Sequence, residues 1–85
     1  HTERQAFYAT PEWAEAVKVV WRRDDAKCQR CGAHADHNRL MHIHHIVSFT
    51  VKELRSEPSN LVLLCAQCHY FVHSKKNVNR EFMKD

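Results

Sequence analysis

The sequence predicts a small α+β domain. Three patterns indicate this class: an amphipathic helical stretch in the N-terminal part, two short aliphatic stretches further on, and a third stretch in which cysteine and histidine recur at helical spacing. The chain has 85 residues, and domains of this size bury a smaller share of their surface than larger domains do. We therefore expect one domain that needs a disulfide or a bound metal in addition to its core.

The first predicted element is a helix over residues 11–24. Thr10 suits the N-cap, and Pro11 suits the first helical position, where its missing N–H costs nothing. The residues that recur at helical spacing and form the apolar face are Trp13, Val17, Val20 and Trp21. We interpret both tryptophans as core residues, with stacking on bases as the alternative. Residues 1–9 show no clear period and are expected to be an N-terminal arm of the domain 10–85.

Two strands are predicted, over residues 40–47 and 61–64, from their β-branched and aliphatic content. Side chains alternate faces along a strand, so His44 and His45 point to opposite sides. Between the strands, Thr50-Val51-Lys52-Glu53 matches a capping box and predicts a short helix that ends before Glu57-Pro58.

A second helix is predicted from Cys65 onward. In this stretch Cys68 follows at i+3, and His69 and His73 lie four residues apart, so that both imidazoles project from one helical face. Further on, Phe82 and Met83 are a docking point for a final short helix.

The cysteines form two Cys-x-x-Cys pairs, the knuckles 28–31 and 65–68. Four thiolates suit tetrahedral zinc, and joining two distant knuckles would stabilise a small fold. Gly32 follows the first knuckle, where such a turn needs a positive φ. A redox dithiol and an iron–sulfur cluster are alternatives, but neither explains the histidines. The predicted zinc ligands are Cys28, Cys31, Cys65 and Cys68.

A second predicted site consists of His44, His45, Asn60, His69 and His73. A divalent ion held by three imidazoles keeps open positions for a phosphate oxygen and a water. Because imidazole titrates near neutral pH, His45 could accept a proton from water, with Asn60 orienting its ring directly or through the backbone. The alternative is that these are ordinary surface or core histidines, the interpretation we keep for His34, His37 and His42.

These residues resemble the HNH endonuclease family of the ββα-metal (His-Me finger) class. The resemblance runs from Trp13 to His73, and it is carried by Cys28-x-x-Cys31-Gly32, Ile43-His44-His45-Ile46, Asn60-Leu61-Val62-x-Leu64-Cys65 and Cys65-x-x-Cys68-His69. It implies a β-hairpin and a helix, a core over residues 40–74, clasping one catalytic divalent ion: Mg²⁺, Mn²⁺, Ni²⁺ or Zn²⁺.

The resemblance also implies residue roles. His45 matches the general base, Asn60 the family asparagine and His69 the final histidine, a metal ligand. His44 matches the ligand position before the base, and His73 completes the His-x-x-x-His of the colicin-like DNase branch. One departure concerns loop shape and substrate contacts: many members have a proline and a glycine-rich turn where this chain has Val47-Ser48-Phe49-Thr50.

The implied activity is hydrolysis of DNA phosphodiesters to 5′-phosphate and 3′-hydroxyl ends. The net charge of +3 alone is too small to establish a nucleic-acid partner. Candidate contacts to the DNA backbone are Arg22, Arg23, Arg30, Lys75 and Lys76. Such contacts read no sequence, so we expect specificity to come from a fused or partner domain. Rival interpretations are a non-catalytic, zinc-stabilised nucleic-acid-binding module of treble-clef type and a protein-interaction domain.

The expected location is the cytoplasm, in a bacterial or phage context. No secretory segment and no apolar run of membrane-spanning length is apparent in the sequence. We therefore expect reduced cysteines and no membrane partner.

Overall fold

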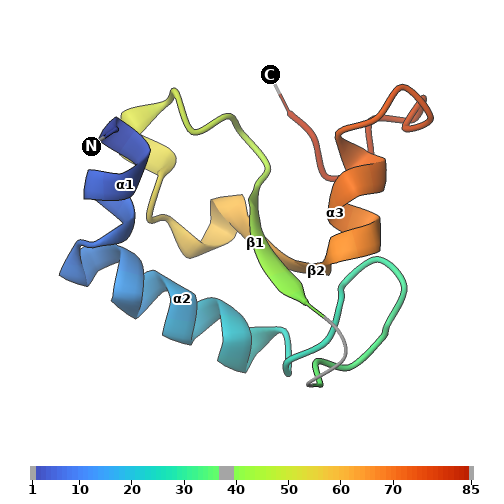
Figure 1. The fold of residues 1–85 in the computed structure, drawn as a ribbon, viewed down its shortest axis with the longest axis horizontal. Coiled ribbons are helices and arrows are strands. Elements are labelled where there is room, and N and C mark those ends of the chain that lie inside the picture. The colour runs from blue at the N-terminus through green and yellow to red at the C-terminus, as the bar shows by residue number, and fades with distance from the viewer. Residues whose placement is uncertain (1, 37–39, 85) are drawn as a thin grey trace.

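The computed structural model describes residues 2–36 and 40–84. Its elements, in chain order, are α1 (Glu3–Tyr8), α2 (Pro11–Arg23), β1 (Met41–His45), η1 (Lys52–Leu54), η2 (Pro58–Asn60), β2 (Leu61–Cys65) and α3 (Ala66–Val72), where η denotes a 3-10 helix. The two strands form an antiparallel hairpin. The hairpin lies between α2 and α3 (Figure 1). The predicted α+β class is confirmed, and β1, β2 and α3 give the expected ββα order.

The helix predicted over residues 11–24 is α2. The Thr10 side chain accepts a hydrogen bond from the Trp13 amide at 3.3 Å, and Pro11 occupies the first turn, as its fixed φ favours. The helix ends at Arg23, and Asp24 is its C-cap. Both tryptophans pack beside a core cluster, in agreement with their interpretation as core residues.

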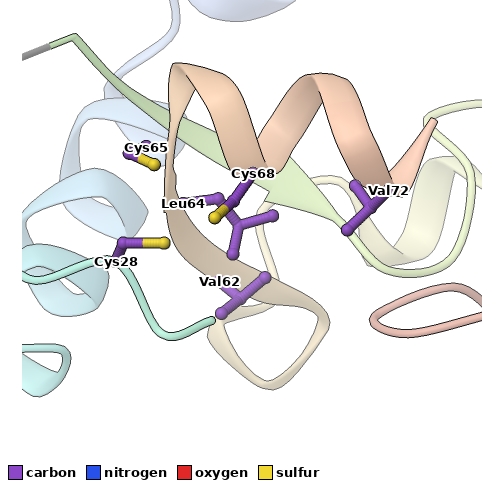
Figure 2. Close-up of a cluster of buried hydrophobic side chains, with 6 residues drawn as sticks. All are labelled: Cys28, Val62, Leu64, Cys65, Cys68 and Val72. Atoms are coloured by element: carbon purple, nitrogen blue, oxygen red, sulfur yellow. The ribbon is translucent and has the colours of Figure 1, made fainter. Parts of the chain in front are cut away.

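Strand β2 is buried on both faces and divides the core in two. Leu61 and Leu63 pack with α2, while Val62 and Leu64 pack on the other face with α3, where they meet Val72 (Figure 2). Full burial of an aliphatic side chain contributes about 1.5–3 kcal/mol. This hydrophobic strand therefore fixes the placement of both helices.

The register of the hairpin assigns each histidine of β1 to a face. His44 pairs with Val62 and His45 with Leu61. Cross-strand partners share a face, so His44 faces α3 and His45 faces α2. The predicted divergence of these neighbouring side chains is thus reproduced.

The stretch expected as an N-terminal arm contains a helix instead. In α1 the Thr2 hydroxyl accepts a hydrogen bond from the Gln5 amide, and the Gln5 side chain accepts one from the Thr2 amide. This capping box starts a helix with no buried residue. The helix is held by aromatic contacts of Phe7 with Trp13 and Phe49.

The capping box predicted at Thr50 is wrong. Thr50 directs its hydroxyl to Ser48 Oγ at 3.0 Å, and the following η1 is one 3-10 turn whose N-cap, Val51, makes no side-chain hydrogen bond. The final short helix expected around Phe82 is also wrong. Residues 77–84 form turns, in which Arg80 and Phe82 have positive φ values.

Within the described ranges 2–36 and 40–84, no helix combines the length and apolar character needed to cross a bilayer.

Candidate active site

The four cysteine sulfurs converge between the first knuckle and the start of α3. Their Sγ atoms all lie within 4.8 Å of one another, and Cys31 Sγ is 3.8 Å from Cys65 Sγ. A tetrahedral ion with metal–sulfur bonds of about 2.3 Å would separate its ligands by about 3.8 Å. Figure 2 shows the sulfurs of Cys28, Cys65 and Cys68 pointing toward one another from the two segments. The arrangement fits a zinc site.

Backbone N–H groups favour the thiolate form of one cysteine in this cluster, Cys28. Burial raises the pKa of Cys28, but N–H groups of Cys31, Cys65 and Arg30 outweigh it and lower the pKa to about 6. Burial and the neighbouring thiols raise the pKa of Cys68 to about 12. A cation bound between the four sulfurs would favour the thiolate form of each of them. As predicted, Gly32 supplies the positive φ, +80°, with which the knuckle turns.

Three imidazoles form the second cluster. His44 from β1 meets His69 from α3 and His73, the C-cap of that helix, with one ring nitrogen of each within 4.8 Å of the others. The Nε2 atoms of His69 and His73 are 3.3 Å apart. Two nitrogens bound to one tetrahedral ion at about 2.0–2.1 Å would lie about 3.3 Å apart. The spacing and chemistry of these donors fit a divalent transition metal.

His44 is held by a backbone group outside the motif. Its Nε2 is 2.7 Å from the carbonyl oxygen of Phe82. A carbonyl only accepts, so Nε2 carries the proton and Nδ1 keeps the lone pair for a metal. Burial lowers the pKa of His44, and burial and the surrounding imidazoles lower the pKa of His69 to about 4. Both rings are therefore neutral at pH 7, as metal ligation requires.

His45 is held in the same way on the opposite face. Its Nε2–H donates to the carbonyl of Arg55 at 3.0 Å, which leaves the Nδ1 lone pair uncommitted by this bond. The ring stacks on Trp13 and meets the edge of Phe49. Burial, followed by the charges of Arg4 and Arg55, lowers the pKa of His45 against the raising effect of the Arg55 carbonyl. The ring is thus a neutral base with a fixed tautomer.

Asn60 does not bond to the ring of His45. Its Oδ1 accepts from the amide of Val47 at 2.7 Å, and its Nδ2 donates to the carbonyls of Val47 and Leu54 at 3.2 and 3.1 Å. Leu54 directly precedes Arg55, whose carbonyl receives the His45 proton. The asparagine therefore joins the two ends of the loop whose Arg55 carbonyl holds the His45 ring, so Asn60 acts on that ring through the backbone and not directly.

Both histidine faces open into one cleft of about 840 Å³. Its walls include His44, His45, His69 and His73, with Trp13 from α2 and Arg4 and Tyr8 from α1. Because β1 is at the edge of a two-stranded sheet, a ligand in the cleft can reach side chains on both faces of the strand. A phosphate group in the cleft would lie close both to the three histidines that could hold a metal ion and to the neutral imidazole of His45.

Comparison with known proteins agrees with this geometry. The family model described as HNH endonuclease matches residues 28–75. The chain belongs to the HNH endonuclease family. A "Probable HNH endonuclease" of Lactococcus phage SK1 is 35% identical over 68 residues, covering 74% of this chain and 70% of that protein. No solved structure gives a significant match.

Membership of the HNH family identifies the chain as a nuclease that uses a divalent metal. The four-cysteine cluster is compatible with a zinc ion in addition. The β-hairpin and following helix, with the histidines between them, are the ββα-metal arrangement that the motifs implied.

Two of the five basic residues suggested as DNA contacts are engaged within this HNH domain. The guanidinium of Arg23 bonds to the Asp24 carboxylate and to the carbonyls of Pro58 and Leu61. Arg30 donates to Cys68 Sγ, lies over the Phe71 ring and pairs with Glu81. Their sequence pattern could not distinguish these structural roles from DNA contacts.

The other three suggested contacts, Arg22, Lys75 and Lys76, are exposed. Lys75 and Lys76 follow α3, beyond His73. The sequence did not point to three further groups at the site: the side chains of Arg4 and Lys84, which line the cleft, and the carbonyl of Phe82. No recognisable spacing marks such isolated cations, and a backbone oxygen has no sequence signal.

The remaining histidines differ in position. His42 is exposed but stacks on His69, with ring centroids 4.9 Å apart, and it lines the cleft. His34 is exposed and does not line it. His37 lies outside the described residues.

Proposed function

We propose that this HNH nuclease hydrolyses DNA phosphodiester bonds to 5′-phosphate and 3′-hydroxyl ends. His45 acts as general base, and one divalent ion is bound by His44, His69 and His73. Zinc at Cys28, Cys31, Cys65 and Cys68 stabilises the fold.

One observation carries the proposal. His45 donates its Nε2 proton to the Arg55 carbonyl, so the nitrogen that can take a proton is Nδ1, and the ring lines the same cleft as the three-histidine cluster. A general base must present a lone pair to water beside the reacting phosphate. A buried histidine of the core would have no such opening.

In the reaction, Nδ1 of His45 removes a proton from a water molecule. The oxygen of that water forms a bond to phosphorus while the bond from phosphorus to the 3′ oxygen breaks. The leaving oxygen takes a proton from a second water molecule and becomes the 3′-hydroxyl. The Arg55 carbonyl continues to accept from Nε2–H and stabilises the resulting imidazolium. A divalent ion held by His44, His69 and His73 would supply Lewis-acid stabilisation of the negative charge that develops on the phosphate and leaving oxygens.

Asn60 and Trp13 act on the base rather than on the substrate. Asn60 fixes the loop that carries the Arg55 carbonyl, and the Trp13 indole limits rotation of the His45 ring. Accurate placement of a catalytic group supplies a large part of enzymatic rate enhancement. Loss of either side chain should lower turnover more than it lowers metal affinity.

The DNA backbone would be bound by exposed cations, two of which line the cleft. Arg22, Lys75 and Lys76 are exposed, and Arg4 and Lys84 line the cleft itself. Contacts of these side chains to phosphate give affinity without sequence readout. We therefore propose that site preference comes from a fused or partner domain.

A plasmid assay tests the proposal. Zinc-loaded protein is incubated with supercoiled DNA and Mg²⁺, Mn²⁺ or Ni²⁺, and nicked products are treated with DNA ligase without prior phosphorylation. We expect nicks that ligase seals, because sealing requires 5′-phosphate and 3′-hydroxyl ends. His45→Ala should lower the cleavage rate about 100-fold or more while leaving the binding of the divalent ion intact.

His34→Ala is the matched control, since it removes an exposed imidazole that does not line the cleft. It should cleave like the wild type. Undiminished cleavage by His45→Ala would reject His45 as the base. Absence of nicking with all three ions would instead favour the non-catalytic nucleic-acid-binding module.

A further inference from the structure

The C-terminal segment, residues 77–84, contacts the histidine cluster although it lies beyond the part matched by the HNH family model, residues 28–75. Its Phe82 carbonyl accepts a hydrogen bond from the Nε2–H of His44 at 2.7 Å. Its Lys84 amide donates a hydrogen bond to the carbonyl of Ile46 at 3.0 Å. The segment thus lies against β1 and its extension (Figure 1).

Asn77 shapes this segment from inside the protein. It is 8% exposed, and its Nδ2 donates to the carbonyls of Val72 and Glu81 at 2.9 and 3.1 Å. Its Oδ1 accepts from the Glu81 amide at 2.9 Å. One side chain therefore joins the end of α3 to the residue that precedes Phe82.

The backbone around Phe82 needs this support. Phe82 has φ +56° and Arg80 φ +53°, in the left-handed region that residues with a side chain rarely adopt. The Phe82 ring packs partly buried against the core cluster of Cys28, Val62 and Val72. Asn77 and this packing together keep the Phe82 carbonyl aimed at His44.

Arg30 makes a second connection, to the cysteine cluster. It pairs with Glu81 at 3.4 Å, donates to Cys68 Sγ at 3.6 Å and lies 3.9 Å above the centre of the Phe71 ring. The segment is thereby attached both to α3 and to the knuckle.

We propose that the C-terminal segment, held by Asn77, is a positioning element that sets the tautomer and orientation of His44 for binding the divalent ion. This inference rests on the proposed function of His44 as a ligand. A hydrogen bond to the second nitrogen of a metal-binding histidine fixes its tautomer, and loss of such a partner typically lowers metal affinity 10- to 100-fold.

Calorimetric titration of zinc-loaded protein with Ni²⁺ measures the predicted effect. Asn77→Ala should weaken Ni²⁺ binding by about 10-fold, with the zinc content unchanged. Asn79→Ala is the matched control, because it makes the same deletion in the same segment at an exposed position, and it should bind like the wild type. His44→Ala removes a proposed ligand and should abolish Ni²⁺ binding, which gives the affinity expected for a lost site.

Side-chain nitrogen NMR without added Ni²⁺ gives a readout that altered stability alone would not move. His44 should show the Nε2–H tautomer in the wild type and a mixture of tautomers in Asn77→Ala. The signals of His34 should stay unchanged.

If Asn77→Ala does not fold, a second variant carries an ester in place of the amide between Phe82 and Met83. A synthetic C-terminal peptide that contains this ester is joined to the rest of the chain at Cys68. The ester weakens the Phe82 carbonyl as a hydrogen-bond acceptor and keeps every side chain. It also removes the Met83 N–H that donates to Arg80. An ester at Val78, whose N–H donates to Lys76, is the control for losing one such bond.

Two outcomes overturn different statements. If His44→Ala abolishes Ni²⁺ binding while Asn77→Ala, or the Met83 ester, retains wild-type affinity and tautomer, the positioning role is rejected and the metal site stands. If His44→Ala binds Ni²⁺ like the wild type, His44 is not a ligand, and the proposed function fails at that residue.

Discussion

The imidazole of His45 stacks on the indole of Trp13, with ring centroids 5.5 Å apart and planes inclined by 15°. The tryptophan comes from α2, which lies before the part of the chain that carries the HNH motifs. The proposed base is therefore supported by Trp13 of α2 and by the Arg55 carbonyl, so α2 contributes to the proposed active site as well as to the core.

Trp13→Ala should slow DNA cleavage about 10-fold or more, because the His45 ring loses the surface that limits its rotation. We expect a stability loss of about 2 kcal/mol, less than for a fully buried tryptophan, because Trp13 is only half-buried. Trp13→Phe should restore most of the rate. Single-turnover cleavage and urea unfolding measure the two effects; a wild-type rate in Trp13→Ala would refute the support role.

Asn60→Ala should destabilise the protein by about 2–3 kcal/mol, because it leaves the Val47 amide and two carbonyls without their buried partner. Cleavage should fall even at temperatures where the variant is fully folded, since the loop bearing the Arg55 carbonyl loosens. Asn60→Asp, which keeps only the acceptor, should also be impaired. Full activity of folded Asn60→Ala would show that the loop holds its shape without this residue.

Cys31→Ser tests the zinc site with little loss of packing, because Cys31 is exposed. We expect loss of tightly bound zinc and a fall of about 10 °C or more in the midpoint of thermal unfolding, since 1 kcal/mol corresponds to about 4–8 °C in a domain of this size. Metal analysis and calorimetry measure both. His73→Ala should keep its zinc; zinc retained in Cys31→Ser would argue against four-cysteine coordination.

Arg22→Gln and Arg23→Gln should separate DNA binding from stability. Arg22 is exposed, so its loss should weaken DNA binding and lower the salt slope by about 0.9. Arg23 bonds to Asp24 and to the carbonyls of Pro58 and Leu61, so its loss should cost about 1–2 kcal/mol of stability. Equal salt slopes for Arg22→Gln and the wild type would exclude Arg22 from the interface.

Spacing predicted the elements that carry the site. The capped helix after Thr10, the two strands and the i, i+4 pair His69 and His73 follow from local rules, so they could be derived from the chain alone. The convergence of the cysteines and of the three imidazoles was also predictable, since both sets join segments that motif spacing relates.

The errors arise where local rules compete or where backbone atoms act. Thr50 fits a capping box, but its hydroxyl instead donates a hydrogen bond to the Ser48 hydroxyl. The helix α1 has no apolar period that would mark it in the sequence. It is held by contacts that exist only in the folded protein, such as the packing of Phe7 on Phe49 and the ion pair of Glu3 with Arg55. The Phe82 carbonyl has no side-chain signature at all, so the orientation of His44 could be known only from the structure.

Anomalous diffraction from crystals of the zinc-loaded protein soaked with Ni²⁺ would locate the second metal and its ligands. We expect one nickel ion bound by Nδ1 of His44 and by Nε2 of His69 and His73, with His45 unligated and its Nδ1 open to the cleft. Nickel bound to His45, or the absence of nickel between β1 and α3, would contradict this expectation.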